Sequence, residues 1–225
     1  MNVSQSDIAT VANHFPQYEE IKSGLYNIRR KNFPKLPPTI NDISLTDDWT
    51  KCQSGGRFLL NHIKDDANGH LIIFCSDTGL EVLAAASRWH SDGTFTITPT
   101  GFKQVYLIHA YYKEAMIPCV YALLTRKTTR IYKRLIHEIK NAALKLKLVL
   151  NPSLIITDFE SAAILAYDYH FPDVNDYHFP DGCFFHFSQS VYRNTVNHGL
   201  KNQYNTDENL KKWVKSLIGG TFLRR

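Results

Sequence analysis

The feature that most constrains the fold is a change in the spacing of apolar residues near the middle of the chain. Three strand-like segments lie at 88–98, 103–112 and 116–124, and turn signals separate them. From Thr129 onward the apolar residues recur at helical spacing instead, and this helix is expected to end before Pro152. The sequence therefore predicts a meander of three strands followed by a long helix.

Beyond this helix, short apolar segments alternate with helical ones. Residues 153–158 (SLIITD) are expected to form a strand that is buried on both faces, and 160–169 a helix. Residues 182–187 (GCFFHF) are expected to form another short strand, and 205–217 a further helix. Three strands, helix, strand, helix, strand and helix is the order of a ribonuclease-H-like α/β fold with a mixed sheet. We expect this fold, incomplete at the C-terminus.

Two further segments are expected to join the same domain from its N-terminal side. Residues 57–75 read as two strands joined by a turn, and 78–81 fit a capping box that opens a short helix. Residues 1–56 are expected to be an N-terminal extension or linker, because the basic residues and prolines of 28–42 favour an extended connector. The predicted core therefore spans 57–204, and 205–225 is expected to begin a truncated helical insertion.

The composition describes an ordinary globular protein of 225 residues, of which 44% are hydrophobic, with a formal net charge of +5. A modest basic excess is compatible with a polyanionic partner but does not by itself indicate one. The sequence contains no apolar run long enough to cross a bilayer and no secretory signal, so we expect a soluble intracellular protein. The scattered cysteines suggest no disulfide framework; they are Cys52, Cys75, Cys119 and Cys183.

Two aspartates are the strongest candidates for chemistry, and each has an ordinary structural explanation. Asp92 precedes Gly93, and this pair between strand-like residues is a common hairpin turn. Asp158 stands directly before a helix, where aspartate is a favoured N-cap. In the predicted fold, however, the strands that carry them lie side by side in parallel, so both carboxylates would reach the carboxyl end of the sheet. Such a pair suits Mg²⁺ or Mn²⁺ and two-metal phosphoryl transfer.

The amino-acid sequence around these residues resembles that of one known family. The segments HSDGTFTITPTGFKQVYLIHA, IPCVYALLTRKT, LIITDFESAAI and GCFFHFSQSVYR are similar to Mutator-like element (MULE) transposases, and the resemblance extends over about residues 57–223. It implies a ribonuclease-H-like fold, an Asp-Asp-Glu triad that cleaves and joins DNA, transposon ends as the DNA partner and a nuclear location. Asp92 and Asp158 match the two aspartates of the triad, and Cys183 with His186 match the Cys-x-x-His motif of the family.

The third member of the triad is not evident in this sequence. The resemblance implies a glutamate beyond the helical insertion that begins at 205–225, so this glutamate is expected past Arg225. Glu208 suits the first turn of a helix, and Glu160 is expected to face away from Asp158. We therefore expect a transposase catalytic core that lacks its third acidic residue and is inactive as this chain. The alternative is a transposase-derived relic that only binds DNA or protein. A homo-oligomer is left open, and a nuclease acting on RNA hybrids fits the motifs less well.

Two further groups of residues have competing interpretations. Cys183 and His186 supply only two of the four ligands of a structural zinc site, and a buried cysteine beside a histidine is favoured over zinc or a Cys-His nucleophile. His186 could instead contact DNA or position a carboxylate. A cluster of basic residues could form a solvated helix face or contact DNA phosphates. Its members are Arg126, Lys127, Arg130, Lys133 and Arg134.

Overall fold

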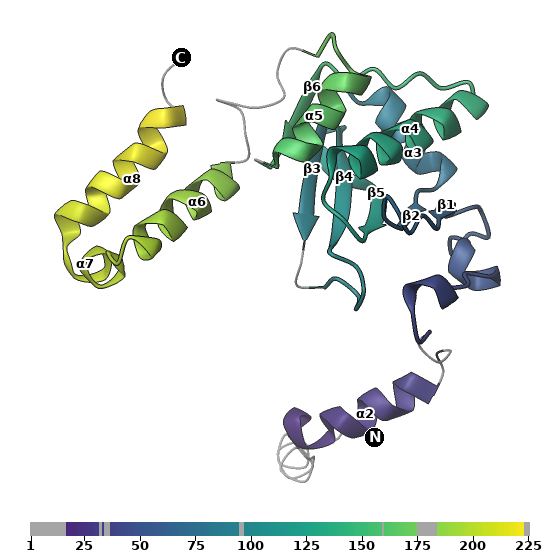
Figure 1. Ribbon diagram of the computed structural model, residues 1–225, viewed down its shortest axis with the longest axis horizontal. Helices are drawn as coiled ribbons and strands as arrows, with labels where there is room; N and C mark the ends of the chain where they lie inside the picture. Colours follow the sequence, from purple (N-terminus) through teal and green to yellow (C-terminus); the bar gives the residue numbers. More distant parts are fainter. Residues whose placement is uncertain are drawn as a thin grey trace, which may run out of the picture. The chain divides into compact units, whose positions relative to one another are not determined.

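The computed structural model describes residues 17–31, 33, 37–94, 97–158, 160–174 and 184–222, with side chains left out at 184–187 and 219–222 (Figure 1). The chain divides into two compact units, Met1–Ile43 and Ser44–Arg225. The second unit therefore begins before residue 57, where the sequence pattern places the start of the core. Each unit is described by itself.

The N-terminal unit contains helix α2 (Tyr18–Lys31) and the 3-10 turn η1 (Ile40–Asp42). The extended connector predicted for 28–42 is therefore wrong at 28–31, which form the last turn of α2. Acidic residues occupy the first turn of α2 and basic residues its last turn, an arrangement that the helix dipole favours. The positive charges of residues 29–31 thus stabilise the C-terminal end of α2, and the prolines come later in the sequence.

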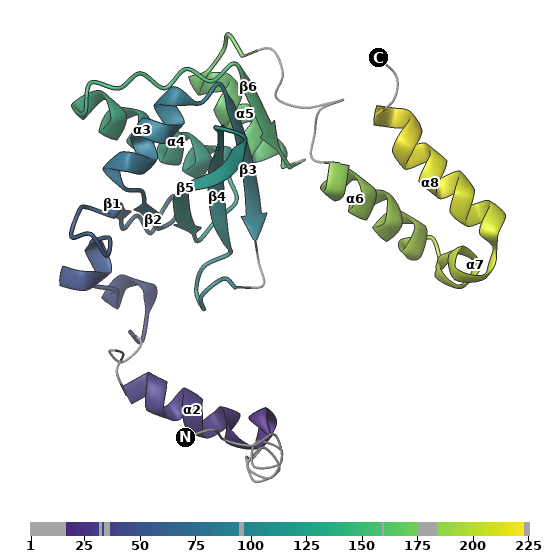
Figure 2. The ribbon, with the colours of Figure 1, turned by 180° about the vertical axis from the view of Figure 1, so that it is seen from behind.

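The second unit is built on one mixed sheet, visible from both sides in Figures 1 and 2. Among the described residues it has six strands in the order β1-β2-β5-β4-β3-β6. Their bounds are β1 Leu59–Ile63, β2 Leu71–Phe74, β3 Arg88–Thr94, β4 Gln104–Tyr112, β5 Ala115–Leu124 and β6 Leu154–Thr157. The predicted meander is β3, β4 and β5, and the hairpin predicted before it is β1 and β2. Strand β6 pairs in parallel with β3, so the mixed sheet is confirmed.

Helices α3 (Asp77–Ala85), α4 (Thr129–Lys145) and α5 (Ser161–His170) share one hydrophobic core with the sheet. Helix α3 follows β2, where the Ser76 hydroxyl accepts a hydrogen bond from Gly79 N. Ser76 is therefore the N-cap, two residues before the predicted capping box. Within the core, Trp89 Nε1 donates to the Leu83 carbonyl at 3.1 Å, and its ring meets Phe171 edge-on. These contacts bind α3 and the end of α5 to the centre of β3.

The two faces of the sheet are distinguished by the alternation along β3. Trp89, Ser91 and Gly93 are buried and share the face that packs on α3, α4 and α5. His90 and Asp92 alternate with them and are half-buried on the opposite face. The 3-10 turn η2 (Asp47–Thr50) precedes β1.

The strand predicted at 182–187 is wrong at 184–187, and residues 182–183 lie outside the described part of the chain. The chain instead enters helix α6 (Phe184–Asn197), followed by α7 (Lys201–Thr206) and α8 (Glu208–Phe222). A short apolar run has no periodicity of its own that separates a buried strand from a buried helix, so the residues after it decide. Val191 and Thr195 continue a spacing of four, and no turn signal interrupts 184–197. The predicted alternation of strands and helices therefore stops after α5.

The helix predicted at 205–217 is present with a break inside its first turn. Asp207 separates α7 from α8, and its Oδ1 accepts hydrogen bonds from Asn209 N at 2.8 Å and Leu210 N at 3.3 Å. Asp207 is thus the N-cap of α8, and Glu208 lies in its first turn as expected. Among the helices described, none is both long and apolar enough to span a membrane.

Candidate active site

The ordinary explanations for the two candidate aspartates are not those the structure adopts. Asp92 lies inside strand β3, paired with Leu107 of β4, and not in a hairpin turn. Asp158 follows the last residue of β6, and the N-cap of α5 is Glu160. Neither aspartate therefore has the local backbone role that its sequence context suggests.

The pairing of β3 with β6 brings the two aspartates to neighbouring positions. The parallel register aligns His90 with Ile156 and Ser91 with Thr157. Asp92 is the next residue of β3, two residues before its end, and Asp158 directly follows β6; adjacent strands lie about 4.8 Å apart. The two backbone positions are therefore adjacent, whereas the meeting of the two carboxylates and a role in catalysis or metal binding remain predictions.

The surroundings of Asp92 are two histidines on the same face of the sheet. His90 and His109 are directly opposite each other on β3 and β4. Burial, with the positive charge of Arg88 and of His109, lowers the pKa of His90 to about 4. Burial also lowers the pKa of His109, and the negative charge of Asp92 opposes that shift. Asp92 is therefore close enough to His109 to act on its charge, and both imidazoles are neutral at pH 7.

Gly93 next to Asp92 is required by a close approach on the other face. A Cβ at Gly93 would lie 2.7 Å from Oε1 of Gln104, which is fully buried. The Gln104 amide is held in place because its Nε2 donates to the hydroxyl of Tyr132 on α4. The glycine therefore serves side-chain packing beneath β3 and not a hairpin turn.

The surroundings of Asp158 include tyrosines of the helix layer. Thr157 Oγ1 donates to Asp158 Oδ1 at 3.3 Å. Burial, together with the negative charges of Glu160 and Asp158, raises the pKa of Tyr132. Burial also raises the pKa of Tyr167 to about 12, and Asp158 contributes to that shift. The Asp158 carboxylate thus acts electrostatically on residues of α4 and α5, whereas Asp92 acts on His109.

Glu160 belongs to the same neighbourhood, although the sequence suggested that it faces away. Its carboxylate forms an ion pair with Lys127 at 2.9 Å, and its side chain is only 14% exposed. It also interacts with the hydroxyl of Tyr132. Sequence reasoning missed this residue because two residues separated by one position point to different sides of a helix, whereas Asp158 and Glu160 both lie before the first residue of α5.

A layer of buried hydroxyl groups lies between the two aspartate-bearing strands and α5. Tyr106 OH donates to Ser91 Oγ at 2.9 Å, and Tyr106 also interacts with Thr157 and Tyr167. Ser91 and Thr157 are the paired residues directly before the two aspartates. The signal in the sequence is a small hydroxyl residue before each aspartate at an otherwise apolar position. These contacts fix β3 and β6 against each other at the level of the candidate site.

The basic residues predicted to contact phosphates divide into two groups. Arg126 Nη2 donates to the carbonyl of Asp66 at 3.2 Å, and Lys127 pairs with Glu160. Arg130, Lys133 and Arg134 lie on one face of α4, because they are spaced by three and four residues. Arg126 and Lys127 thus precede α4, whereas the second group shares one face of that helix; phosphate contact by either group remains a prediction.

The remaining candidates can be placed only in part. Cys183 lies outside the described residues, and His186 is described only as backbone of α6. Within the described part of the chain, no group of three or more His, Cys, Asp or Glu side chains is arranged to hold a metal ion. Asp92 and Asp158 offer hard carboxylate oxygens of the kind that Mg²⁺ and Mn²⁺ prefer, so the donor chemistry of this pair fits such an ion.

A family model matches the part of the chain that contains this site. Residues 88–190 match the MULE transposase domain, from the first residue of β3 into α6. Both candidate aspartates lie within the matched segment. No curated protein matches the chain.

Proposed function

We propose that the second unit is the catalytic core of a DNA transposase, with Asp92 and Asp158 as ligands of a divalent cation. The observation that carries this proposal is the parallel register of Ser91 with Thr157, which makes Asp92 inside β3 and Asp158 just after β6 adjacent backbone positions. The match of 88–190 to the MULE transposase domain supports the same assignment. The strand order β5-β4-β3-β6, with a parallel β6, is also that expected of a ribonuclease-H-like fold.

In this proposal Mg²⁺ or Mn²⁺ would supply Lewis-acid activation of the attacking oxygen and stabilisation of the leaving oxygen of a DNA phosphodiester. The chain's own contribution is to hold the two carboxylates. Asp92 is held by the ladder between β3 and β4, and Asp158 by Thr157 and the start of α5. The hydroxyl layer of Ser91, Tyr106 and Tyr167 supports both strands from the helix side.

The proposed partner is duplex DNA at transposon ends, and the nuclear location follows from the family alone. By its resemblance to the family, we propose that a complete core also needs a third carboxylate, a glutamate that is not assigned within these 225 residues. We therefore propose that these 225 residues bind Mn²⁺ or Mg²⁺ weakly and do not cut DNA. A chain extended through that glutamate is expected to gain metal-dependent nicking.

The test is nicking of a terminal-repeat duplex by both forms in the presence of Mn²⁺. In the extended chain, Asp92→Asn and Asp158→Asn should each abolish nicking, because the amide keeps the shape of the side chain but removes its charge. Asp173→Asn, at an exposed position after α5, is the matched control and should retain full activity. Nicking that persists in both site variants would contradict the proposal. Nicking by the shorter chain would show that the third carboxylate is already present.

A further inference from the structure

A cavity of about 350 Å³ lies on the helix side of the second unit, between the turn that joins β1 to β2, the first half of α4 and the end of α5. This volume is in the range of small-ligand sites. The basic residues of its lining are Arg130, Lys133, Arg134, His137 and His170. Asp92 and Asp158 do not line it. The cavity is therefore a second place where a ligand could bind.

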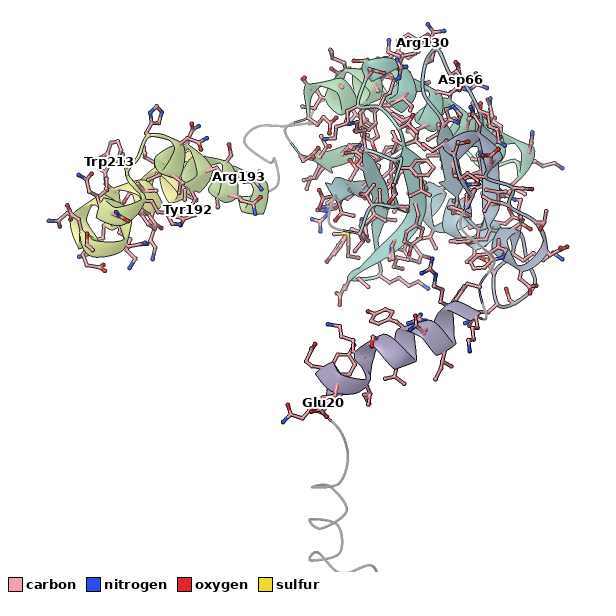
Figure 3. All side chains as sticks on the ribbon, turned by 60° about the horizontal axis from the view of Figure 1, so that its bottom comes forward. Glu20, Asp66, Arg130, Tyr192, Arg193 and Trp213 are labelled. Atoms are coloured by element: carbon pink, nitrogen blue, oxygen red, sulfur yellow. The ribbon has the colours of Figure 1, made fainter. Side chains whose placement is uncertain are left out.

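The cations outnumber the carboxylates that line the cavity. Among the described residues of the lining, Asp65 is the one acidic residue, and Asn68 already donates to it from its backbone N at 2.9 Å and its Nδ2 at 2.8 Å. These hydrogen bonds, with a smaller effect of Arg130, lower the pKa of Asp65. Asp66 in the same turn instead pairs with His70 at 2.8 Å. In Figure 3, Arg130 and Asp66 lie at the same edge of the core.

Two of the cations are oriented by neighbours: a carboxylate offsets the charge of Arg134, and an aromatic ring lies under Lys133. Arg134 Nε contacts Glu138 at 2.6 Å, and Glu138 also accepts from Asn61 Nδ2 at 2.8 Å. Lys133 Nζ lies 3.8 Å from the centroid of the Tyr169 ring, which adds no negative charge. The positive side chains are thus partly pre-ordered, which reduces the entropy lost when they bind an anion.

The two histidines differ in what they offer an anion, and His170 is close to further positive charge. His170 Nε2 lies 2.9 Å from the Lys133 carbonyl, which only accepts, so this nitrogen carries a proton. Burial lowers the pKa of His170, and so do the positive charges of Lys140, His137 and Lys133. His137 Nε2 lies 2.9 Å from Asn141 Nδ2, which donates, so the proton of the neutral ring is on Nδ1.

The turn beside the cavity leaves no room for a side chain at position 69, which is a glycine. Gly69 has φ +105°, and a Cβ there would lie 3.0 Å from Thr125 Oγ1 and 3.2 Å from Ile131 Cδ1. The turn consequently packs directly against the start of α4. Ile63, Leu71 and Ile131 provide apolar lining, whereas the exposed ring of Tyr169 lies on the α5 side.

We infer that this cavity binds a phosphate group, and that the phosphate belongs to the backbone of a DNA strand. Guanidinium groups bind phosphate oxygens with paired hydrogen bonds, and Lys133 and the Nδ1–H of His137 supply further donors, whereas the Nε2–H of His170 is donated to the Lys133 carbonyl. The phosphate site itself stands on the cavity and its charges. The identification of DNA as the source rests on the proposed function.

The experiment measures binding of two probes to the 225-residue chain in the presence of EDTA, which excludes any divalent cation. The probes are inorganic pyrophosphate and a 20-base-pair duplex. The double variant Arg130→Gln/Lys133→Gln removes two cations from the cavity. The control Lys145→Gln/Lys147→Gln removes two exposed cations at and just past the far end of the same helix. Thermal melting of both variants checks that they remain folded.

We expect pyrophosphate to shift the amide resonances of Gly69, Ile131 and His170, and the cavity variant to bind it at least about tenfold more weakly, as loss of charge-assisted hydrogen bonds implies. The control should bind within about twofold of the unchanged chain. For the duplex, the salt dependence should fall by roughly 0.9 in log-log slope for each phosphate that the variant no longer neutralises. Weaker binding of both probes assigns the site to the DNA backbone.

Weaker binding of pyrophosphate alone would support a phosphate site but overturn DNA as its source. Equal binding by the cavity variant and the control, or shifts located away from the cavity, would overturn the site itself. Both binding measurements are made in EDTA, so neither depends on a divalent cation at Asp92 and Asp158. Failure of the metal centre at Asp92 and Asp158 is therefore distinguishable from failure of this inference.

Discussion

Gly93, the residue next to Asp92, packs tightly against the side chain of Gln104. Replacing Gly93 with alanine adds a Cβ that would lie 2.7 Å from Gln104 Oε1 and 3.3 Å from its Cδ. Gln104 cannot easily retreat, because it is fully buried and its Nε2 donates to Tyr132. We expect Gly93→Ala to lower the free energy of unfolding by about 1–3 kcal/mol, the usual cost of overpacking.

Chemical denaturation measures this loss. Gly56→Ala is the matched control, because only Ser54 Oγ lies within reach, at 3.9 Å, and its effect should be within about 0.5 kcal/mol. Shortening Gln104 to serine in the Gly93→Ala background should recover part of the loss caused by the clash. An unchanged stability in Gly93→Ala would mean that Gln104 does not hold β3 from below.

Among the elements, the strands were more predictable from sequence than the helix ends. The segments β3, β4, β5 and β6 have strong β patterns and clear turn signals, and the pairing of β3 with β6 followed from the order of elements. The N-caps Ser76 and Glu160 were missed, because several polar residues compete at each helix start and tertiary contacts decide among them. The run 184–187 was misread because a short segment with three phenylalanines fits either state.

The residues of the candidate site were likewise predicted only in part. Asp92 and Asp158 were found because they lie at the ends of recognisable strands. The partners that surround them were not. Gln104, Tyr132 and Glu160 approach from different elements, and no spacing in the sequence links residues that meet only through packing.

Helix α8 depends on a cap that can be tested by itself. Asp207 Oδ1 accepts from two backbone N–H groups of the first turn. We expect Asp207→Ala to weaken this helix by about 0.5–2 kcal/mol, the usual value of an N-cap. Amide hydrogen exchange should then be faster at Trp213 and Val214. Glu208→Gln keeps the cap and should change exchange far less; equal acceleration in both variants would contradict the capping role.

At the scale of the whole molecule, several histidines make stability depend on pH. Burial lowers the pKa of His62, His90, His109 and His170 below 6.5, so the unfolded chain binds more protons than the folded one as pH falls below that value. The free energy of unfolding should therefore decrease as the pH falls from 6.5 to about 4, which is the pKa of His90.

Denaturant melts at pH 7.5, 6 and 5 measure this dependence. His90→Gln should flatten the decrease over this interval, because it removes one of the groups that titrate only on unfolding. His198→Gln, at an exposed position after α6, is the control and should leave the curve unchanged. A His90→Gln variant with the same pH dependence as the unchanged chain would contradict the assignment.

The central claim is that Asp92 and Asp158 hold one divalent cation together, and paramagnetic broadening by Mn²⁺ tests it most directly. Titrating the 225-residue chain with Mn²⁺ should broaden amide resonances at the ends of both β3 and β6. Asp92→Asn and Asp158→Asn should each remove the broadening at both strand ends, whereas Asp173→Asn should preserve it. Broadening that survives both substitutions, or that is confined to one strand end, would contradict a shared metal site.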